Sequence, residues 1–324
     1  MDIIANVDNR RVIANYKDYL STIPLNSINM LRFNMAKWDE WDEIENVIIN
    51  VEGSIREKVL FDFPIPNNKV RVYTKGKKFK RVHKNRLNKI WINPSLSVQG
   101  TFFCYTDIDI KKEVKRHYIE YGDGEVVLHI INITDEYIEF KTDVDFMFIN
   151  GKGINVGKLE NTLLKSYNLD RMKSILEKTG VNQVALSFVH SSKEVIHIRK
   201  ILGGHIRLIS KIEDQIGINN IKEIQEASDD IMLGRGDLGI YCDSFKIGIF
   251  QQEILKTYSN VYVATDILNS FKYKEIPNRA DIIDVTNIFL NKAKGILLPI
   301  GIKNYEYVIE FINNLEKEIE KFDV

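Results

Sequence analysis

The chain has 324 residues, which is long for one hydrophobic core and suggests about two domains. Its 45 basic and 45 acidic residues leave no net charge, so no overall attraction to nucleic acid or to an anionic membrane is expected. Two cysteines and the lack of an apolar run of membrane-spanning length exclude a disulfide-stapled secreted protein and an integral membrane protein. The composition therefore predicts a soluble cytoplasmic protein.

The first seventy residues alternate short apolar strands with helices. Residues 11–16 (RVIANY), 28–33 (INMLRF) and 58–61 (KVLF) are the first three predicted strands. An amphipathic helix is predicted over residues 38–51, behind the second strand. Strands that alternate with helices in this way imply a parallel sheet.

Residues 73–153 break the alternation, because strands and turns crowd together in segments such as FFCYTD and YGDGEVVLHIINI. An all-β domain inserted after the third strand is predicted. The basic run KGKKFKRVHKNR within it is typical of a nucleic-acid patch. The alternative is a solvated basic edge, or one that attracts phosphorylated ligands, and the neutral total charge favours it. No nucleic-acid partner is therefore expected.

Strands and helices alternate again from residue 157 to the end of the sequence. With the first three strands, the later ones make eight, which predicts a closed (β/α)8 barrel formed by residues 1–72 and 154–324. The later predicted strands are residues 183–188, an apolar run that ends at Leu208 and Ile209, and residues 230–233, 260–264 and 295–298. The predicted helices include residues 170–179, 193–202, 219–227 and 305–322.

Charged residues follow the fifth and sixth strands of this predicted barrel. Lys211 and Glu213 come directly after the fifth strand, and the sixth runs into Gly234-Arg235-Gly236-Asp237. The carboxyl ends of barrel strands form one face, so the side chains of Lys211, Glu213 and Asp237 are expected to converge. Two carboxylates suit Mg²⁺, and a neighbouring lysine supplies charge to an oxyanion. A solvated ion-pair network on loops is the alternative.

Three blocks resemble the signature blocks of the pyruvate kinase family. They are ISKIEDQIGINN, IQEASDDIMLGRGDLG, and VATDILNSF followed by PNRADIIDVTN. The blocks are long, gapless and in the family's order. The resemblance covers nearly the whole chain and is close from about Val184 to Asn287. It implies a TIM barrel with an inserted β lid, and phosphoryl transfer between phosphoenolpyruvate and ADP.

The resemblance also implies roles for individual residues. Glu213 and Asp237 would bind Mg²⁺ or Mn²⁺, Lys211 would stabilise the transferring phosphoryl group and the enolate, and Thr265 would serve proton transfer. The substrate-binding residues implied are Arg235, Gly236 and Asp237, which would present backbone N–H groups to the substrate carboxylate, together with Ser187.

The block LRFNMAK resembles the family's RLNFSH block and implies that Arg32 lies near the substrate phosphate. Asn34 and Asp62 match two K⁺ ligands of the family. Ala36 and Phe63 stand where the family has the serine and threonine that complete the K⁺ site. K⁺ is therefore not expected to be required.

The nucleotide side departs further from the family. Lys69 occupies the position where K⁺-independent members carry lysine, and its ammonium is expected to reach Asp62 in place of the ion. Arg71, Lys152 and Lys37, which replaces a family histidine, are the candidate nucleotide-binding residues. Solvent-facing lysines are the alternative for Lys37 and Lys69, because an insertion disturbs the loop before Lys69.

The sequence ends at the helix after the eighth strand, where typical family members continue into a C-terminal regulatory domain. That domain is expected to be absent, and the protein is expected to be a monomer or a dimer formed through the barrel. The family's SGETA block is replaced by PIGIK at residues 299–303. Three functions stay open: pyruvate kinase, an enzyme that uses the metal-enolate site for another pyruvate or phosphoenolpyruvate reaction in a specialised pathway, and a non-catalytic ligand-binding protein.

Overall fold

The structure is a computed structural model that describes residues 1–36, 40–64, 70–76, 79–92, 95, 97, 101–105, 110, 114, 117–122, 125–155, 168–242 and 244–321. The chain divides into two compact units. Unit 1 comprises Met1–Ile65, Tyr167–Leu238 and Ser244–Val324, and unit 2 comprises Pro66–Ser166 with Gly239–Asp243.

Unit 1 is built on a closed barrel of eight parallel strands in the order β1-β17-β16-β15-β14-β13-β3-β2. Every residue of β3, β13 and β15 is buried, as expected for parallel strands covered on both faces. The predicted (β/α)8 barrel is thus confirmed. The strands are β1 (Asp2–Asn6), β2 (Met30–Asn34), β3 (Val59–Phe63), β13 (Gln183–Leu186), β14 (Arg207–Ile212), β15 (Asp230–Gly234), β16 (Val261–Ala264) and β17 (Gly295–Leu297).

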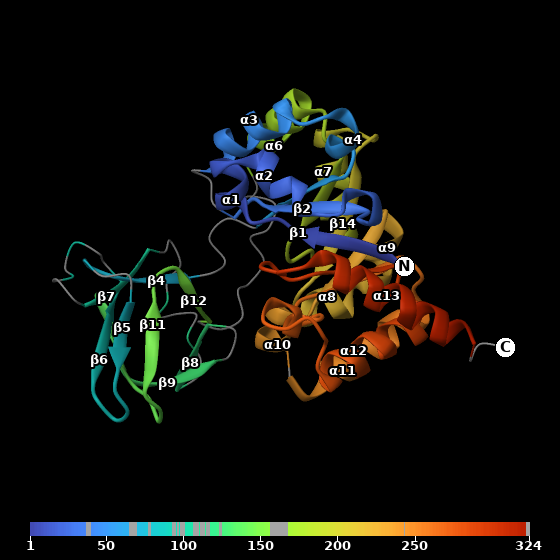
Figure 1. The fold of residues 1–324 in the computed structure, drawn as a ribbon. Helices are drawn as coiled ribbons and strands as arrows, with labels where there is room; N and C mark the ends of the chain where they lie inside the picture. Colours follow the sequence, from blue (N-terminus) through green and yellow to red (C-terminus); the bar gives the residue numbers. More distant parts are fainter. Residues whose placement is uncertain are drawn as a thin grey trace. The chain divides into compact units, whose positions relative to one another are not determined.

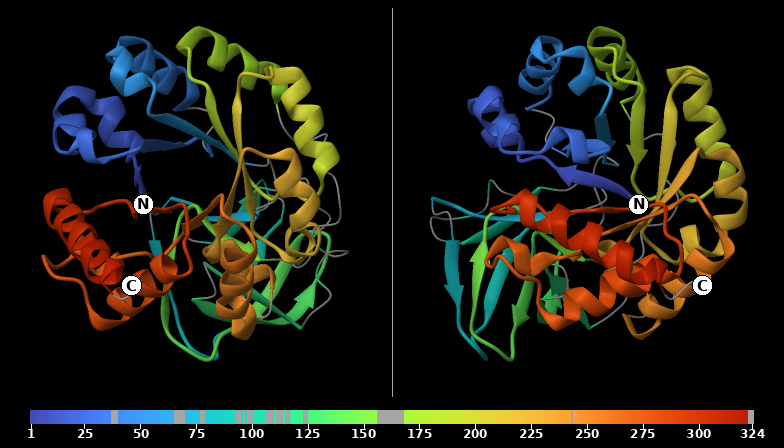
Figure 2. Two further views of the ribbon diagram at one scale, coloured as in Figure 1. Left: turned by 90° about the vertical axis from the view of Figure 1, so that its right-hand side faces the viewer. Right: turned by 45° about the vertical axis from the view of Figure 1, so that its right-hand side comes forward.

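Helices surround these strands on the outside of the barrel (Figures 1 and 2). Most of the longer ones bury one apolar face and expose a polar one, as α13 does with Val308, Ile309 and Ile312. The helices of this unit are α1 (Asn9–Ala14), α2 (Tyr16–Ser21), α3 (Trp41–Asn50), α4 (Gly53–Arg56), α6 (Leu169–Thr179), α7 (Ser192–Leu202), α8 (Gln215–Asn219), α9 (Ile221–Ala227), α10 (Arg235–Tyr241, whose end belongs to unit 2), α11 (Ile247–Thr257), α12 (Arg279–Leu290) and α13 (Tyr305–Glu320), with short 3₁₀ turns at Leu25–Ser27, Ser244–Lys246 and Asn269–Lys272.

The barrel interior is packed with side chains and is closed at the amino ends of its strands by a polar network. One buried cluster joins residues from all eight strands, including Ile4, Met30 and Ile209. At the amino end of β15, Asp230 is 1% exposed and forms ion pairs with Arg207, at 2.7 Å, and with Lys294. This network leaves the carboxyl ends of the strands as the open face of the barrel.

The predicted first strand, residues 11–16, is wrong. These residues lie in α1 and at the start of α2, and β1 lies further towards the N-terminus, where Ile3, Ile4 and Ala5 are buried. Asp8 caps α1 because its carboxylate accepts a hydrogen bond from the Arg11 N–H at 3.5 Å. The cap favours a helix over the strand that the β-branched residues of this segment suggest.

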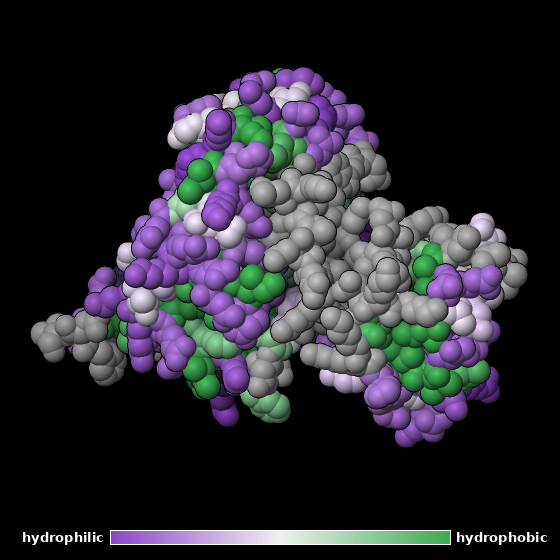
Figure 3. Space-filling model, turned by 180° about the vertical axis from the view of Figure 1, so that it is seen from behind, coloured by the Kyte–Doolittle hydropathy of each residue, from purple (hydrophilic) through white to green (hydrophobic). Residues whose placement is uncertain are grey.

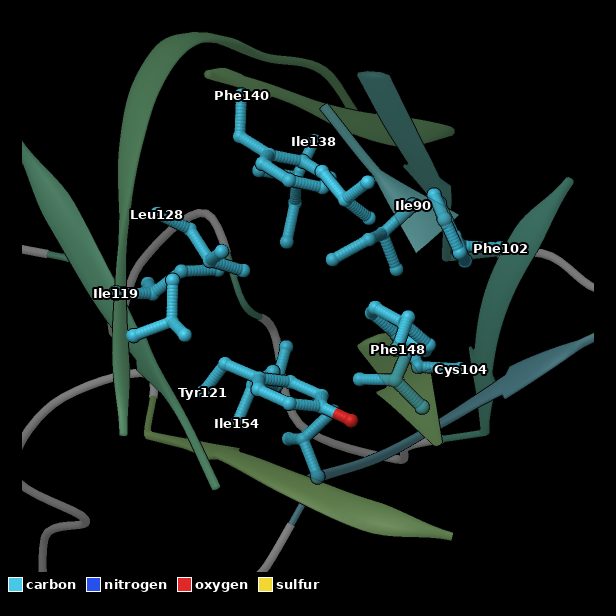
Figure 4. Packing of buried hydrophobic residues seen from close by; sticks show 14 of the residues in the cluster. Ile90, Phe102, Cys104, Ile119, Tyr121, Leu128, Ile138, Phe140, Phe148 and Ile154 are labelled. Carbon is cyan, nitrogen blue, oxygen red and sulfur yellow. The ribbon is translucent and has the colours of Figure 1, made fainter. Parts of the chain in front are cut away.

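The described part of unit 2 consists mainly of β-strands, which confirms the predicted β insertion after the third barrel strand. Seven strands close a second barrel in the order β10-β6-β7-β4-β12-β8-β9, and two more pair as a separate ribbon. Side chains such as Phe102, Phe140 and Phe148 fill the interior of the second barrel (Figure 4). The strands are β4 (Val70–Thr74), β5 (Phe79–Val82), β6 (Asn88–Trp91), β7 (Phe102–Tyr105), β8 (Tyr118–Tyr121), β9 (Val126–Ile133), β10 (Tyr137–Lys141), β11 (Phe146–Ile149) and β12 (Lys152–Asn155).

Hydrophilic residues cover most of the surface of unit 1 in Figure 3, with smaller apolar areas between them. Among the described residues, none of the helices has the length and the apolar composition needed to span a membrane.

Candidate functional site

The predicted site residues of unit 1 lie at the carboxyl ends of neighbouring barrel strands. Arg32 and Asp62 lie in β2 and β3, Lys211 lies near the end of β14, and Arg235 begins the helix that follows β15. Because all eight strands run in the same direction, these ends share one face of the barrel. Ser187 and Thr265 are the first residues after β13 and β16 on the same face.

A buried network of charges occupies the centre of this face. Asp62 is 2% exposed; its Oδ2 accepts a hydrogen bond from Arg32 Nε at 2.7 Å and forms an ion pair with Arg32 Nη2 at 2.6 Å. Lys211 Nζ lies 3.2 Å from the same oxygen, 3.0 Å from Ser187 Oγ and 3.0 Å from Glu213 Oε1. The ammonium is thus held between two carboxylates and a hydroxyl.

The charges of this network shift one another's pKa values. Burial alone would lower the pKa of Lys211, but Asp62 and Glu213 outweigh it and raise the pKa above its usual value. Burial alone would raise the pKa of Asp62, but Lys211 and Arg32 lower it below the usual value. Lys211 therefore stays a cation, and Asp62 an anion, at neutral pH.

Glu213 and Asp237 form the candidate metal centre. Burial raises the pKa of Glu213, and the nearby carboxylates of Asp237 and Asp62 raise it further against the effect of Lys211. Repulsion between two adjacent carboxylates is what a hard divalent cation relieves, and carboxylate oxygens are the ligands that Mg²⁺ prefers. Gly234 lies close beneath Glu213, since a Cβ added there would be 2.7 Å from Glu213 Cγ. The donor set fits Mg²⁺.

This centre has few protein ligands. Within the described ranges, no group of three or more His, Cys, Asp or Glu side chains is arranged to bind a metal ion. Mg²⁺ commonly takes one or two carboxylates and completes its coordination with water or substrate oxygens. A centre of two carboxylates therefore suits an ion that shares its coordination with a substrate.

Thr265 is exposed and lies in a strained backbone conformation. Its φ is +76° and that of Asp266 is +56°, a region that a β-branched residue rarely adopts and that costs about 1–3 kcal/mol per residue. Gly236 lies directly against it, because a Cβ added to Gly236 would be 2.9 Å from Thr265 Cγ2. The structure thus places Thr265 beside the start of α10, which begins at Arg235.

The Arg235 side chain is directed towards the protein. Its Nε and Nη2 donate to the carbonyl oxygen of Thr265 at 3.0 and 2.7 Å, and its Nη1 pairs with Asp284 at 2.7 Å. Arg235 was predicted to bind substrate through its backbone N–H, and these contacts leave that prediction open. These contacts engage the Arg235 side chain and not its backbone N–H.

The predicted monovalent-cation region offers few oxygens. Asn34 is paired with Asp62 in the register of β2 and β3, but its Oδ1 accepts a hydrogen bond from the Ala36 N–H at 3.0 Å. Phe63 is fully buried, and its ring lies 5.1 Å from that of Trp41 in an edge-on contact. The residue that stands in place of the family threonine therefore serves packing between the barrel and α3.

The remaining predicted residues lie in unit 2 or outside the described residues. Arg71 and Lys152 lie in unit 2, where Arg71 donates to the Gly151 carbonyl at 2.6 Å and Lys152 pairs with Glu125. Lys37 and Lys69 lie outside the described residues. The predicted contact of Lys69 with Asp62 stays a prediction.

Several supporting residues were missed by the sequence analysis. Asn6 Oδ1 accepts from Arg32 Nη1 at 2.8 Å, and the misplaced first strand concealed it. The Phe188 N–H donates to Glu213 Oε2 at 2.9 Å, and His190 Nε2 lies 2.7 Å from Asp214 Oδ2. Of these missed residues, Asn6 alone has a sequence pattern that could have indicated it, because it ends the apolar run DIIAN.

Comparisons with known proteins give a consistent family. A sequence model described as the pyruvate kinase barrel domain matches residues 3–311. Pyruvate kinase of Thermotoga maritima is 29% identical over 315 residues, which cover 91% of this chain and 66% of that protein. Pyruvate kinase of Methanocaldococcus jannaschii is 31% identical over 210 residues, which cover 62% of this chain and 46% of that protein. Pyruvate kinase of Candida albicans is 28% identical over 263 residues, which cover 78% of this chain and 49% of that protein. The chain spans about half to two thirds of the length of these relatives.

Proposed function

Because this chain belongs to the pyruvate kinase family, we propose that it transfers a phosphoryl group between phosphoenolpyruvate and ADP. In this reaction the bond between phosphorus and the enol oxygen breaks, and a bond forms from phosphorus to a terminal oxygen of ADP. The enolate that remains takes one proton at its C3 carbon and becomes pyruvate. The observation that carries the proposal is the buried Lys211, held between Asp62 and Glu213 beside Asp237.

Lys211 would stabilise the negative charge that moves between the enol oxygen and the phosphoryl group. Its contacts fix the ammonium before substrate arrives, so little reorganisation is needed when charge develops. Its raised pKa keeps the charge in place at neutral pH. Arg32 would add positive charge on the side of the substrate phosphate, oriented by Asp62 and Asn6.

Glu213 and Asp237 would hold the divalent cation, Mg²⁺ or Mn²⁺. When bound, that ion supplies charge to the carboxylate and enolate oxygens of the substrate. The Phe188 N–H fixes one Glu213 oxygen and Lys211 the other, so the carboxylate is oriented without the ion. Ser187 and the backbone N–H groups of Arg235, Gly236 and Asp237 at the start of α10 would bind the substrate.

Thr265 would serve the proton transfer. Its hydroxyl-bearing side chain is exposed at the open face and lies on Gly236. As the C3–H bond of pyruvate forms, the O–H bond of Thr265 would break, and solvent would return the proton to the oxygen. Arg71, Lys152 and Lys37 are the proposed contacts to the nucleotide.

A second candidate function uses the same enolate chemistry without ADP as acceptor. The observation that favours it is the loss of oxygen ligands on the phosphate side, where Phe63 packs against Trp41 and Ala36 has no side-chain oxygen. Such an enzyme would act on pyruvate or phosphoenolpyruvate with the metal and Lys211 in the same roles.

A coupled assay with phosphoenolpyruvate, ADP and Mg²⁺ tests the proposal, with pyruvate formation as the readout. We expect Mg²⁺-dependent pyruvate and ATP in equal amounts. Exchange of pyruvate methyl protons with deuterated water is measured by NMR on the same samples. Exchange without ATP formation would contradict phosphoryl transfer to ADP and favour the second function. Neither activity, with Mg²⁺-dependent binding of oxalate retained, would favour a non-catalytic ligand-binding protein.

A further inference from the structure

The guanidinium of Arg235 links four separate elements at the open face of unit 1. Arg235 begins α10, Thr265 follows β16, and the remaining partners lie on α11 and α12. Nε and Nη2 bind the Thr265 carbonyl, while Nη1 donates to Asp284 Oδ1 at 2.7 Å and to Gln251 Oε1 at 3.2 Å. Four of the five N–H donors of the guanidinium are thereby used within the protein. The Arg235 side chain is 14% exposed; its bonds to Gln251 and Asp284 are partly buried, whereas its two bonds to the Thr265 carbonyl are exposed.

Thr265 needs such support because its backbone conformation is unfavourable. Thr265 and Asp266 follow one another with φ of +76° and +56°, and Leu268 adds a third positive value at +53°. Conformations of this kind persist when surrounding contacts fix them, and they gather at functional sites. The contacts that fix this segment come from two adjacent residues that lie about thirty positions earlier in the chain: Arg235 binds the carbonyl of Thr265, and Gly236 lies against its methyl group.

We propose that Arg235 is a positioning residue, which acts through the carbonyl of Thr265 to hold the hydroxyl of Thr265 over the reacting carbon. This inference rests on the proposed function, because it assigns Arg235 to the proton-transfer step of that reaction. The planar guanidinium is suited to this positioning role. Its Nε and Nη2 donate to the same carbonyl oxygen of Thr265, while Nη1 is held by Asp284. A lysine ammonium has a single nitrogen and cannot bind the Thr265 carbonyl, Asp284 and Gln251 with the same geometry.

The variant Arg235→Lys tests the proposal, with Arg279→Lys as its matched control. Arg279 is an exposed arginine at the first position of α12 and is not among the partners of Arg235 or Thr265. A displaced proton donor lowers the rate of its own step and leaves ground-state binding intact. We therefore expect Arg235→Lys to slow pyruvate methyl exchange and turnover about 10- to 100-fold, with little change in KM for phosphoenolpyruvate or in Mg²⁺-dependent oxalate binding. The control should match the unmodified protein.

A double-mutant cycle separates this role from general structural support. If Arg235 acts through Thr265, Arg235→Lys should have almost no further effect in a Thr265→Ala background, because the hydroxyl that it positions is gone. The variant Asp284→Asn, which loosens the anchor of the guanidinium, should show a smaller loss of the same kind. Equal losses from Arg235→Lys in both backgrounds would overturn the proposal. A raised KM with unchanged turnover would also overturn it.

Failure of the proposed function can be distinguished from failure of this inference. If the unmodified protein shows neither exchange nor phosphoryl transfer, the proposed function is wrong, and the position of Thr265 is then read directly. The ¹³C-methyl NMR signal of Thr265 should shift towards its unfolded position in Arg235→Lys and stay unchanged in Arg279→Lys. An unchanged signal in Arg235→Lys would overturn the positioning role by itself.

Discussion

Two buried aspartates, one at each end of the barrel, allow stability and function to be tested separately. Asp62 lies between Arg32 and Lys211 at the open face, and Asp230 lies between Arg207 and Lys294 at the closed end. They are 2% and 1% exposed. Replacing either with asparagine leaves two cations with no carboxylate between them.

The expected losses follow from how far each pair of cations is shielded. The side chains of Arg32 and Lys211 are 13% and 11% exposed, and removing one partner of such a buried ion pair costs about 3–5 kcal/mol. The side chains of Arg207 and Lys294 are 32% and 31% exposed and can be rehydrated, so Asp230→Asn should cost about 2–3 kcal/mol. For a unit of this size, each kcal/mol lowers the melting temperature by about 2–4 °C.

Differential scanning calorimetry with EDTA present measures these losses without a contribution from bound metal. Asp62→Asn should melt about 6–20 °C lower than the unmodified protein, and Asp230→Asn about 4–12 °C lower. In a separate titration with Mg²⁺, Asp62→Asn should bind oxalate more weakly, because Lys211 and Arg32 lose the carboxylate that positions them. Asp230→Asn should bind it normally. An unchanged melting temperature for Asp62→Asn, or lost oxalate binding in Asp230→Asn alone, would refute this reasoning.

Two further predictions concern the region around the substrate. Replacing K⁺ with tetramethylammonium at constant ionic strength should leave turnover unchanged. Asp62 is already neutralised by two cations, and Asn34 Oδ1 already accepts a hydrogen bond from the Ala36 N–H. Strong activation by K⁺ would contradict this prediction, because it would show that the ion site is intact. Gly236→Ala should slow pyruvate methyl exchange at least as much as Arg235→Lys. The new Cβ would be 2.9 Å from Thr265 Cγ2 and would displace the Thr265 side chain. Exchange at the normal rate would contradict the placement of Thr265.

Local signals predicted the strands around the site well. β13, β14 and β15 are buried along nearly their whole length, as expected for parallel strands covered on both faces. The convergence of Lys211 and Glu213 on one face of the barrel could therefore be predicted from their positions at the carboxyl end of β14. The first strand was misplaced because the capping of α1 by Asp8 depends on a single side chain, and Asn6 was missed with it.

Non-local contacts account for most of what the sequence did not predict. The bond from Arg235 to the Thr265 carbonyl joins residues thirty positions apart, and a threonine carries no local signal for a positive φ. The loss of a threonine oxygen at Phe63 was visible in the sequence, but its packing against Trp41 depends on how α3 lies on the barrel. Side-chain partners of this kind follow from the closed barrel and cannot be derived from spacing.

Calorimetric titration with oxalate, a mimic of the pyruvate enolate, tests the central claim most directly, with and without Mg²⁺ and in the variant Asp237→Ala. Oxalate should bind the unmodified protein in the presence of Mg²⁺ and not in its absence. Asp237→Ala should lose this binding and keep its melting temperature in EDTA, because one carboxylate replaces too little of the hydration shell to hold the ion. Unchanged Mg²⁺-dependent binding of oxalate by Asp237→Ala would contradict the assignment of Glu213 and Asp237 as the metal centre.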